Sequence, residues 1–214
     1  MVGWAVDAGV DFMIGETFYY HGEAEIALEV CQSAGLPSVI TYGLMGENVL
    51  WDGMDVDEAC KRLCDKGADV VGMNCFRGPD TMMPWLEKIR KKVDCHMAAL
   101  PVSYRTTADH PTFFNLPDQG NTAALPHSTT FPTGLDPLSV NRWELAQWGK
   151  QAFDMGIRYL GICCGCTPVQ IRALAEALGR TPPASKYSPD MSKQFLFGTD
   201  PTLKKHITAK KDTA

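Results

Sequence analysis

The sequence lacks long hydrophobic runs, a basic face and a secretion signal. Nowhere among its 214 residues is there a stretch of about 18 apolar residues, the length that a membrane-spanning helix requires. The net charge is -5 at pH 7, and the lysines that cluster lie in the polar C-terminal tail, which argues against a nucleic-acid partner. The amino terminus has no basic segment followed by an apolar one. We therefore expect a cytoplasmic protein with no nucleic-acid or membrane partner.

The chain has eight cysteines, which a small secreted protein would use as a disulfide framework. Without a secretion signal, and with 45% hydrophobic residues to build a core, reduced thiols are expected instead. Cysteine is often a small buried hydrophobe, so half of them are interpreted as core or surface residues. These four are Cys31, Cys60, Cys64 and Cys95.

Short apolar segments alternate with helical patterns along most of the chain. The apolar segments are nearly continuous, which is typical of strands in a parallel sheet. They cover residues 11–16, 38–42, 69–75, 95–101 and 158–163. The helical patterns cover residues 23–34, 55–66, 80–92, 139–155 and 167–178. This α/β alternation fits a doubly wound sheet or a (β/α)8 TIM barrel. No G-x-G-x-x-G phosphate loop follows a strand, which favours the barrel, here an incomplete C-terminal portion of about five βα units.

Two stretches fall outside this alternation. Residues 102–137 make a connection about three times the usual length, and the aromatic residues in it indicate that part of it is packed. Residues 181–214 lack regular periodicity and are predicted to form an extended arm or a disordered end. We therefore expect a partial barrel domain over residues 1–180 and a C-terminal arm or tail over residues 181–214.

Three cysteines fall at the ends of predicted strands, where a TIM barrel builds its active site. Cys75 ends GMNC, and Cys163 and Cys164 end YLGICC. Three thiolates without a fourth protein ligand are typical of a zinc ion with one open position, which can take a substrate thiol and lower its pKa. Cys166 lies beyond the next glycine and is interpreted as a bystander, with a substitute ligand as the alternative. Glu16 closes the first predicted strand. A buried carboxylate there suits the ammonium group of an amino acid, although it can instead pair with a basic neighbour.

Several motifs resemble the zinc-dependent homocysteine S-methyltransferases. They are GETFYYHGEAEIALE, GMNC, GICCG and TPVQIRALAEAL. The segment PTGLDPLSVNRWELAQWGKQAFDMGIRYLGICCG and the later PPAS are most similar to the betaine-homocysteine S-methyltransferase branch, and the resemblance runs from about Ala5 to Ser185. Two positions depart from the family, which often has Gly and His where this chain has Ile162 and Gln170.

The resemblance implies a role for each residue at the predicted strand ends. Cys75, Cys163 and Cys164 would ligate Zn2+. Glu16 would hold the amino group of homocysteine, and Asn74 would orient the first ligand or line the substrate site. The implied reaction is methyl transfer from betaine, or from a related donor such as S-methylmethionine or a methylfolate, to homocysteine, giving methionine.

Family members begin with three more strands, which hold much of the methyl-donor pocket, whereas this chain starts near the fourth. Five strands cannot close an eight-stranded barrel, so two sheet edges would face water. The alternative expectation is therefore an inactive fragment, or a subunit that forms a homo-oligomer or binds a chain supplying the missing strands.

Overall fold

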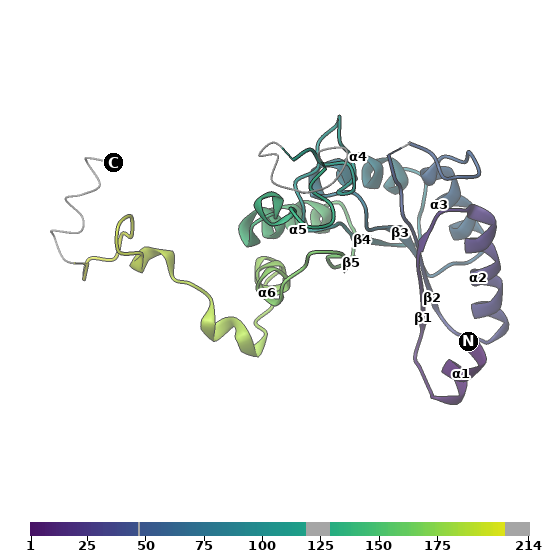
Figure 1. Cartoon of the computed structure of the whole chain (residues 1–214). Coiled ribbons are helices and arrows are strands. Elements are labelled where there is room, and N and C mark those ends of the chain that lie inside the picture. Colours follow the sequence, from purple (N-terminus) through teal and green to yellow (C-terminus); the bar gives the residue numbers. More distant parts are fainter. Residues whose placement is uncertain (47, 119–128, 204–214) are drawn as a thin grey trace. The chain divides into compact units, whose positions relative to one another are not determined.

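The computed structural model describes residues 1–46, 48–118 and 129–203. The chain divides into two compact units, Met1–Arg180 and Thr181–Ala214. In the first unit, all strands are parallel and form one sheet in the order β1-β2-β3-β4-β5 (Figure 1). The strands are β1 (Met13–Phe18), β2 (Ser38–Tyr42), β3 (Val70–Asn74), β4 (His96–Leu100) and β5 (Tyr159–Leu160). The five-stranded parallel sheet predicted from the sequence is thus confirmed.

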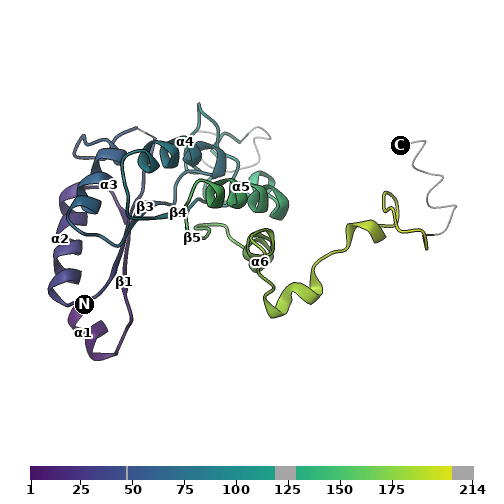
Figure 2. The same ribbon diagram turned by 180° about the vertical axis from the view of Figure 1, so that it is seen from behind.

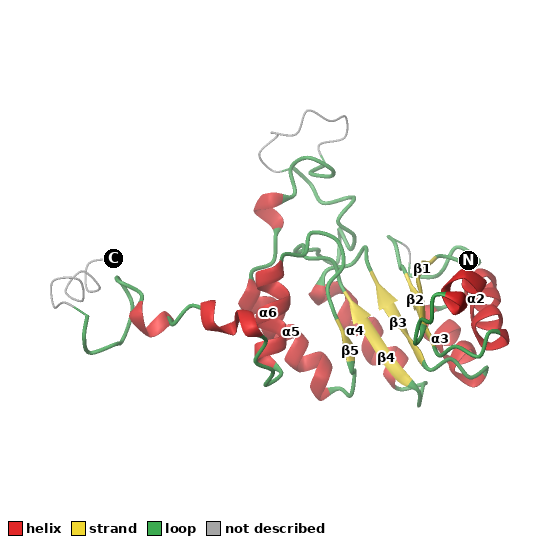
Figure 3. Ribbon diagram, turned by 90° about the horizontal axis from the view of Figure 1, so that it is seen from below, coloured by secondary structure: helices red, strands yellow, loops and turns green. Residues whose placement is uncertain are grey.

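Helices alternate with the strands along the chain. They are α1 (Val2–Asp7), α2 (His21–Ser33), α3 (Val56–Asp65), α4 (Pro79–Arg90), α5 (Arg142–Asp154) and α6 (Pro168–Ala177), with a 3-10 turn η1 (Asp136–Leu138) before α5. Parallel crossovers are almost always right-handed, so a sheet whose strands are in sequence order carries its connecting helices on one side. Figure 3 shows α2 to α5 following the same side of the sheet. The short helix α1 was not predicted; none of its residues is buried, and no side chain caps it.

The main core lies between the sheet and these helices. Each helix from α2 to α5 buries a large side chain there: Leu28, Leu63, Leu86 and Trp148. Burying a side chain of this size stabilises the fold by about 1.5–3 kcal/mol. Within each helix the buried residues recur at helical spacing, as Ala24, Leu28 and Cys31 do in α2, which is why the pattern located the helices within a few residues.

Close backbone packing explains two glycines of the first unit. A Cβ atom on Gly72 in β3 would lie 2.0 Å from the carbonyl oxygen of Ala98 in β4, so only glycine fits between these strands. Helices α5 and α6 pack against each other (Figure 2). There, a Cβ atom on Gly149 would lie 1.9 Å from Cδ1 of Leu174. Both glycines therefore allow neighbouring elements to approach closely.

Strands β1 and β5 are the edges of the sheet as far as the structure describes it. Ile14 on β1 is 43% exposed and Phe12 just before it is 48% exposed. At the amino-terminal ends of the strands, a hollow of about 290 Å³ is lined by Phe12, Val39, Val70 and Tyr159, among others. Apolar side chains thus face solvent along the β1 edge and at one end of the sheet.

Part of the long connection between β4 and α5 is packed. Phe113, Leu116 and Leu135 are all buried, which confirms the expectation drawn from its aromatic content. Residues 119–128 of the predicted loop lie outside the described residues. The described part of the chain contains no helix that is both long and apolar enough to cross a membrane.

The second unit begins with two 3-10 turns, η2 (Pro183–Tyr187) and η3 (Met191–Lys193). Asp190 caps η3, because its carboxylate accepts a hydrogen bond from the backbone N–H of Ser192 at 3.1 Å. Residues 204–214 of the predicted tail lie outside the described residues.

Candidate metal centre

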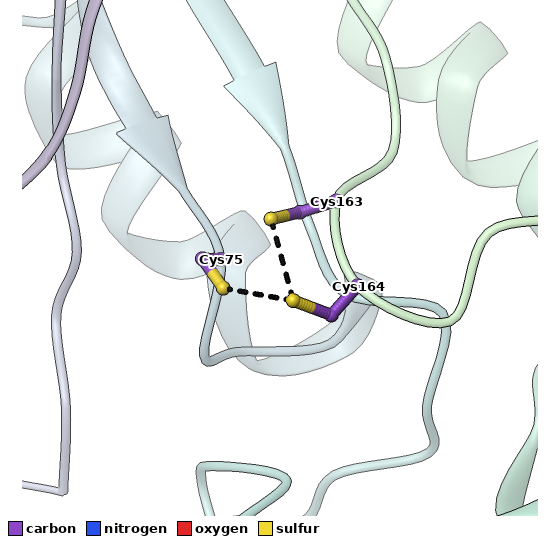
Figure 4. Close-up of side chains that lie close together, drawn as sticks. All are labelled: Cys75, Cys163 and Cys164. Atoms are coloured by element: carbon purple, nitrogen blue, oxygen red, sulfur yellow. Dashed lines mark hydrogen bonds between the residues drawn. The ribbon is translucent and has the colours of Figure 1, made fainter.

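Three sulfur atoms meet at the carboxyl ends of β3 and β5. The sulfurs of Cys75 and Cys164 are 3.6 Å apart, and those of Cys163 and Cys164 are 3.8 Å apart (Figure 4). All three lie within 4.8 Å of one another. Tetrahedral zinc with Zn–S bonds of about 2.3 Å separates its sulfur ligands by roughly 3.8 Å. The donor set and its spacing therefore fit a zinc ion.

Cys75 is placed by a sharp backbone turn directly after β3. Cys75 and Phe76 both have left-handed backbone conformations, with φ of 62° and 54°. The turn is held by hydrogen bonds from Cys75 N–H to the Leu100 carbonyl at 2.9 Å and from Arg77 N–H to the Cys75 carbonyl at 2.7 Å. Left-handed conformations of non-glycine residues cost on the order of 1–3 kcal/mol each and cluster at functional sites. The chain thus maintains a strained turn at this point.

The other two cysteines follow β5 rather than belonging to it. The sequence predicted a strand from residue 158 to residue 163, but β5 ends at Leu160. Beyond it, Cys163 N–H donates to the Pro101 carbonyl at 2.7 Å, and Ser103 N–H donates to the Cys164 carbonyl at 2.9 Å. The segment therefore remains paired with the continuation of β4, although not as a regular ladder, and this pairing brings both sulfurs toward Cys75.

Gly165 completes this turn. Its φ is 78°, and a Cβ atom there would lie 2.5 Å from the ring of Tyr104. Glycine is the residue that accommodates both the left-handed backbone and the close approach of an aromatic ring. The GICCG motif thus supplies two sulfurs together with the turn that positions them.

The three thiols influence one another's protonation. A hydrogen bond from the Cys75 thiol lowers the pKa of Cys163 to about 6, while the same contact and burial raise the pKa of Cys75. Burial also raises the pKa of Cys164. One sulfur of the cluster is therefore readily held as a thiolate, the form that binds metals.

Asn74 links three strand ends beside the sulfurs. Its side-chain oxygen accepts hydrogen bonds from Thr17 N–H and from the Thr41 hydroxyl, each at 2.8 Å. Its amide nitrogen donates to the Thr17 hydroxyl at 2.6 Å and to the Glu16 carboxylate at 3.3 Å. Asn74 is fully buried, so these bonds replace the water that its amide would otherwise bind. Thr17, with φ of 65°, is a further strained residue.

Glu16 lies next to this network, and its negative charge acts on Cys163, whose pKa it tends to raise. The expectation of a buried carboxylate is wrong, because Glu16 is exposed on β1, which is an edge strand of the sheet in the described residues. The ion pairs found among the described residues do not include Glu16, so they offer no support for the alternative of a basic neighbour.

Cys166 is not part of the sulfur cluster found in the described residues. Its thiol donates instead to the carbonyl of Thr167 at 3.5 Å. This geometry agrees with the interpretation of Cys166 as a bystander.

Gln170, one of the two departures from the family, has a structural role. Its amide nitrogen donates to the Ser103 hydroxyl and to the Val140 carbonyl, each at 2.6 Å, and its oxygen accepts from Thr167 N–H at 2.8 Å. Gln170 therefore connects the start of α6 to the segment that pairs with Cys164.

Thr17, Thr41 and Ser103 support the site but were not predicted to do so. Each contributes a hydroxyl group near the end of an apolar strand. The signal in the sequence that could have indicated them is a polar residue at the end of an otherwise apolar strand. Their partners, however, are 57, 33 and 67 positions away in the sequence, so the pattern could not identify them.

An aromatic cluster borders the sulfurs. Phe76 stacks on Phe113 with ring centroids 6.4 Å apart, and Phe113 stacks on Phe114 at 4.2 Å. Cys75 is buried within this cluster, and Cys163 packs against it. One side of the metal centre is thereby shielded from water.

Comparisons with known proteins agree with the motifs. A family model described as Homocysteine S-methyltransferase matches residues 2–178. Over 179 residues the chain is 34% identical to betaine-homocysteine S-methyltransferase 1 of Xenopus laevis, covering 81% of this chain and 41% of that protein. Over 206 residues it is 32% identical to S-methylmethionine-homocysteine S-methyltransferase BHMT2 of Mus musculus, covering 91% of this chain and 53% of that protein.

Solved structures show the same fold. The homocysteine methyltransferase MmuM from Escherichia coli in its apo form matches with a TM-score of 0.57 and 19% identity, covering 82% of this chain and 52% of that chain. A metallated form of MmuM matches with a TM-score of 0.57 at 18% identity, covering 82% of this chain and 48% of that chain. The parallel sheet is therefore of the TIM-barrel type. The chain spans about half the length of the curated relatives it matches.

Proposed function

Because the chain belongs to the homocysteine S-methyltransferase family, we propose that it carries the zinc and homocysteine sites of an enzyme that methylates homocysteine to methionine. The observation that supports this most directly is the triangle of sulfur atoms from Cys75, Cys163 and Cys164, whose spacing fits zinc. Bound there, zinc would lower the pKa of the homocysteine thiol and hold it as a thiolate.

The residues around the sulfurs supply the rest of the homocysteine site. The Glu16 carboxylate is the negative group beside Cys163, and we assign it the ammonium group of homocysteine. Asn74 donates to that carboxylate at 3.3 Å and so fixes its position relative to the turn that carries Cys75. The aromatic cluster limits access of water to the reacting sulfur.

The reaction itself is a displacement at a methyl carbon. The homocysteine sulfur forms a bond to the methyl carbon of the donor while the bond from that carbon to the donor's nitrogen or sulfur breaks. The electron pair of the broken bond stays on the leaving group, which loses its positive charge when the donor is an onium compound. We propose betaine as the first donor to test, with S-methylmethionine and a methylfolate as alternatives, since relatives named for betaine and for S-methylmethionine both match.

The donor is tested by incubating the zinc-loaded chain with homocysteine and each candidate in turn, and measuring methionine by mass spectrometry. We expect methionine from betaine, in an amount that depends on zinc. Activity with S-methylmethionine or methylfolate alone would overturn the choice of betaine. Zinc and homocysteine binding without methionine from any donor would favour the partner-dependent alternative.

That alternative is supported by the open edges of the sheet. The exposed Ile14 and Phe12 along β1 would be covered if further strands completed an eight-stranded barrel, supplied by another chain or a second copy of this one. Size-exclusion chromatography distinguishes the two cases, because a well-behaved monomer with methyltransferase activity needs no such partner.

A reducing cytoplasmic setting is part of the same proposal, since all eight cysteines are free.

Replacing Glu16 by glutamine tests the ammonium assignment. The substitution keeps the shape and the acceptor for Asn74 but removes the charge, so we expect the KM for homocysteine to rise about tenfold, or ~1.4 kcal/mol, with a smaller change in kcat. The exposure of Glu16 keeps this effect moderate. Glu23, an acidic residue in the first turn of α2, provides the matched control as Glu23→Gln and should leave the KM unchanged. A KM that stays the same in Glu16→Gln contradicts the assignment.

A further inference from the structure

A second pair of cysteines lies at the other end of the sheet. Cys64 is in the last turn of α3, and Cys95 directly precedes β4. The Cys95 N–H donates to the Cys64 sulfur at 3.4 Å. Strands β3 and β4 are parallel, with Val70 paired to His96 and Asn74 paired to Leu100. The Cys64–Cys95 pair and the metal centre are therefore separated by the length of these strands, which is about five residues or roughly 17 Å.

The spacing of the two cysteines suits a covalent bond between them. A cysteine's own sulfur lies only about 3 Å from its backbone nitrogen, so a partner sulfur 3.4 Å from that nitrogen can be reached by rotating one side-chain torsion. Disulfides form between cysteines whose Cβ atoms are about 3.5–4.5 Å apart. The contact between the Cys95 N–H and the Cys64 sulfur shows that the two residues are direct neighbours. Both residues are half-buried, which leaves them reachable from solvent.

The polar contacts around the pair differ between the two sulfurs. Lys61 acts electrostatically on Cys64 and Asp94, and Arg90 donates to the carbonyl of Cys95 at 3.3 Å. The Cys64 thiol also donates to the Asp94 carboxylate at 3.2 Å, which orients it. Burial raises the pKa of Cys95 to about 12, so Cys95 is the less reactive member.

The neighbouring cysteines lack these features. Cys60, one turn before Cys64 on α3, is fully buried, and its thiol donates to the Gly72 carbonyl at 3.9 Å. Cys31 on α2 is also buried, and burial raises its pKa. Only Cys64 and Cys95, among the cysteines away from the metal centre, combine exposure with a thiol partner.

We propose that Cys64 and Cys95 form a thiol-disulfide exchange site that takes a low-molecular-weight disulfide such as oxidised glutathione. The Cys64 thiolate attacks one sulfur of that disulfide, whose S–S bond breaks, and the first glutathione leaves as a thiolate. The Cys95 sulfur then attacks Cys64 in the mixed disulfide and releases the second glutathione. The two protons lost by the cysteines go to the two leaving thiolates, and the two electrons lost by the cysteines reduce the glutathione disulfide.

The new bond would join residues that are 31 positions apart in the sequence. The closed loop contains β3, the Cys75 turn and α4, so the bond would connect the end of α3 to the start of β4 around them. Closing a loop restricts the unfolded chain, and the oxidised protein should therefore melt several degrees above the reduced one. This inference does not depend on the proposed methyltransferase function.

The test uses the full-length, zinc-loaded chain in glutathione buffers of increasing oxidised fraction. Remaining thiols are alkylated before tryptic digestion and mass spectrometry. We expect one cross-linked species that joins the peptide from Leu63 to Lys66 with the peptide from Val93 to Arg105, together with two equivalents of glutathione released per chain. Cys31→Ser should form it as well as the natural chain does.

Two variants separate the roles of the members. Cys95→Ser should stop at a stable mixed disulfide between Cys64 and glutathione, and Cys64→Ser should leave Cys95 largely unmodified. The proposal is overturned if both peptides remain fully alkylated at the highest oxidised fraction of glutathione, or if the natural chain accumulates only mixed disulfides. Equal modification of Cys95 in Cys64→Ser would overturn the order of attack.

Discussion

Replacing Cys75 by alanine is expected to weaken zinc binding at least 100-fold and to abolish methyl transfer. Altering residues that merely support metal ligands already costs about 10–100-fold in affinity, and Cys75 contributes one of only three sulfurs in the cluster. The measurement is bound zinc per chain, determined with a colorimetric chelator after dialysis at a fixed free zinc concentration. Circular dichroism shows whether the variant keeps its helices and strands.

Cys166→Ala is the matched control for this experiment. Cys166 is half-buried and lies two positions after Cys164, yet it is outside the sulfur cluster. It should keep full zinc content. Undiminished zinc in Cys75→Ala would exclude the assigned site, and an equal loss in Cys166→Ala would move Cys166 from bystander to ligand.

Asn74→Leu is expected to lower the free energy of unfolding by about 2–5 kcal/mol. The leucine side chain fills a similar volume but leaves the Thr17 N–H and the hydroxyls of Thr17 and Thr41 without the partner they have now. Each buried polar group left unsatisfied costs about 1–3 kcal/mol. Urea denaturation followed by circular dichroism measures the change. Zinc affinity should fall as well, because the turn carrying Cys75 directly follows Asn74.

Thr41→Val is the graded comparison for Asn74→Leu. It removes only the hydroxyl that donates to Asn74 at 2.8 Å and keeps the shape of the side chain, so a loss of about 1 kcal/mol is expected. If Asn74→Leu is no less stable than Thr41→Val, Asn74 does not hold the strand ends together as described.

Sequence patterns were sufficient for the elements that build the sheet. Strand β2 has the predicted bounds, and β1, β3 and β4 begin and end within two residues of them. Apolar runs and terminating glycines are local signals, so they can be detected without knowledge of the fold. Strand β5 is the exception, because it ends at Leu160 and not at the predicted residue 163. Beyond Leu160, Cys163 and Cys164 form hydrogen bonds with the residues that follow β4, but these bonds do not make a regular ladder.

One rule predicted part of the candidate site: the carboxyl ends of parallel strands meet at the same edge of the sheet. That rule brings Cys75 together with Cys163 and Cys164 without any coordinates, and the structure places their sulfurs together. Their role as zinc ligands stays a prediction. The rule says nothing of exposure, and Glu16 is open to solvent because β1 has no neighbour on its outer side in the described residues.

Sequence patterns could not predict contacts between elements that are distant in the sequence. Cys64 and Cys95 were interpreted as separate core or surface residues, yet α3 and the start of β4 bring them together. The bonds of Asn74 to Thr17 and Thr41 likewise depend on three strand ends meeting. Such contacts follow from the packing of a helix or strand on its neighbours, which no single segment specifies.

The short strand β5 gives the sulfur cluster a second consequence. Only two residues of this strand pair with β4, while Cys75 and Cys164 are 89 positions apart in the sequence. A zinc ion held by both would act as a removable cross-link between the middle of the chain and its last βα unit. Zinc binding would add to the free energy of unfolding, by an amount that grows with the logarithm of the free zinc concentration above the dissociation constant. Folding of this unit would then report on the zinc supply of its surroundings.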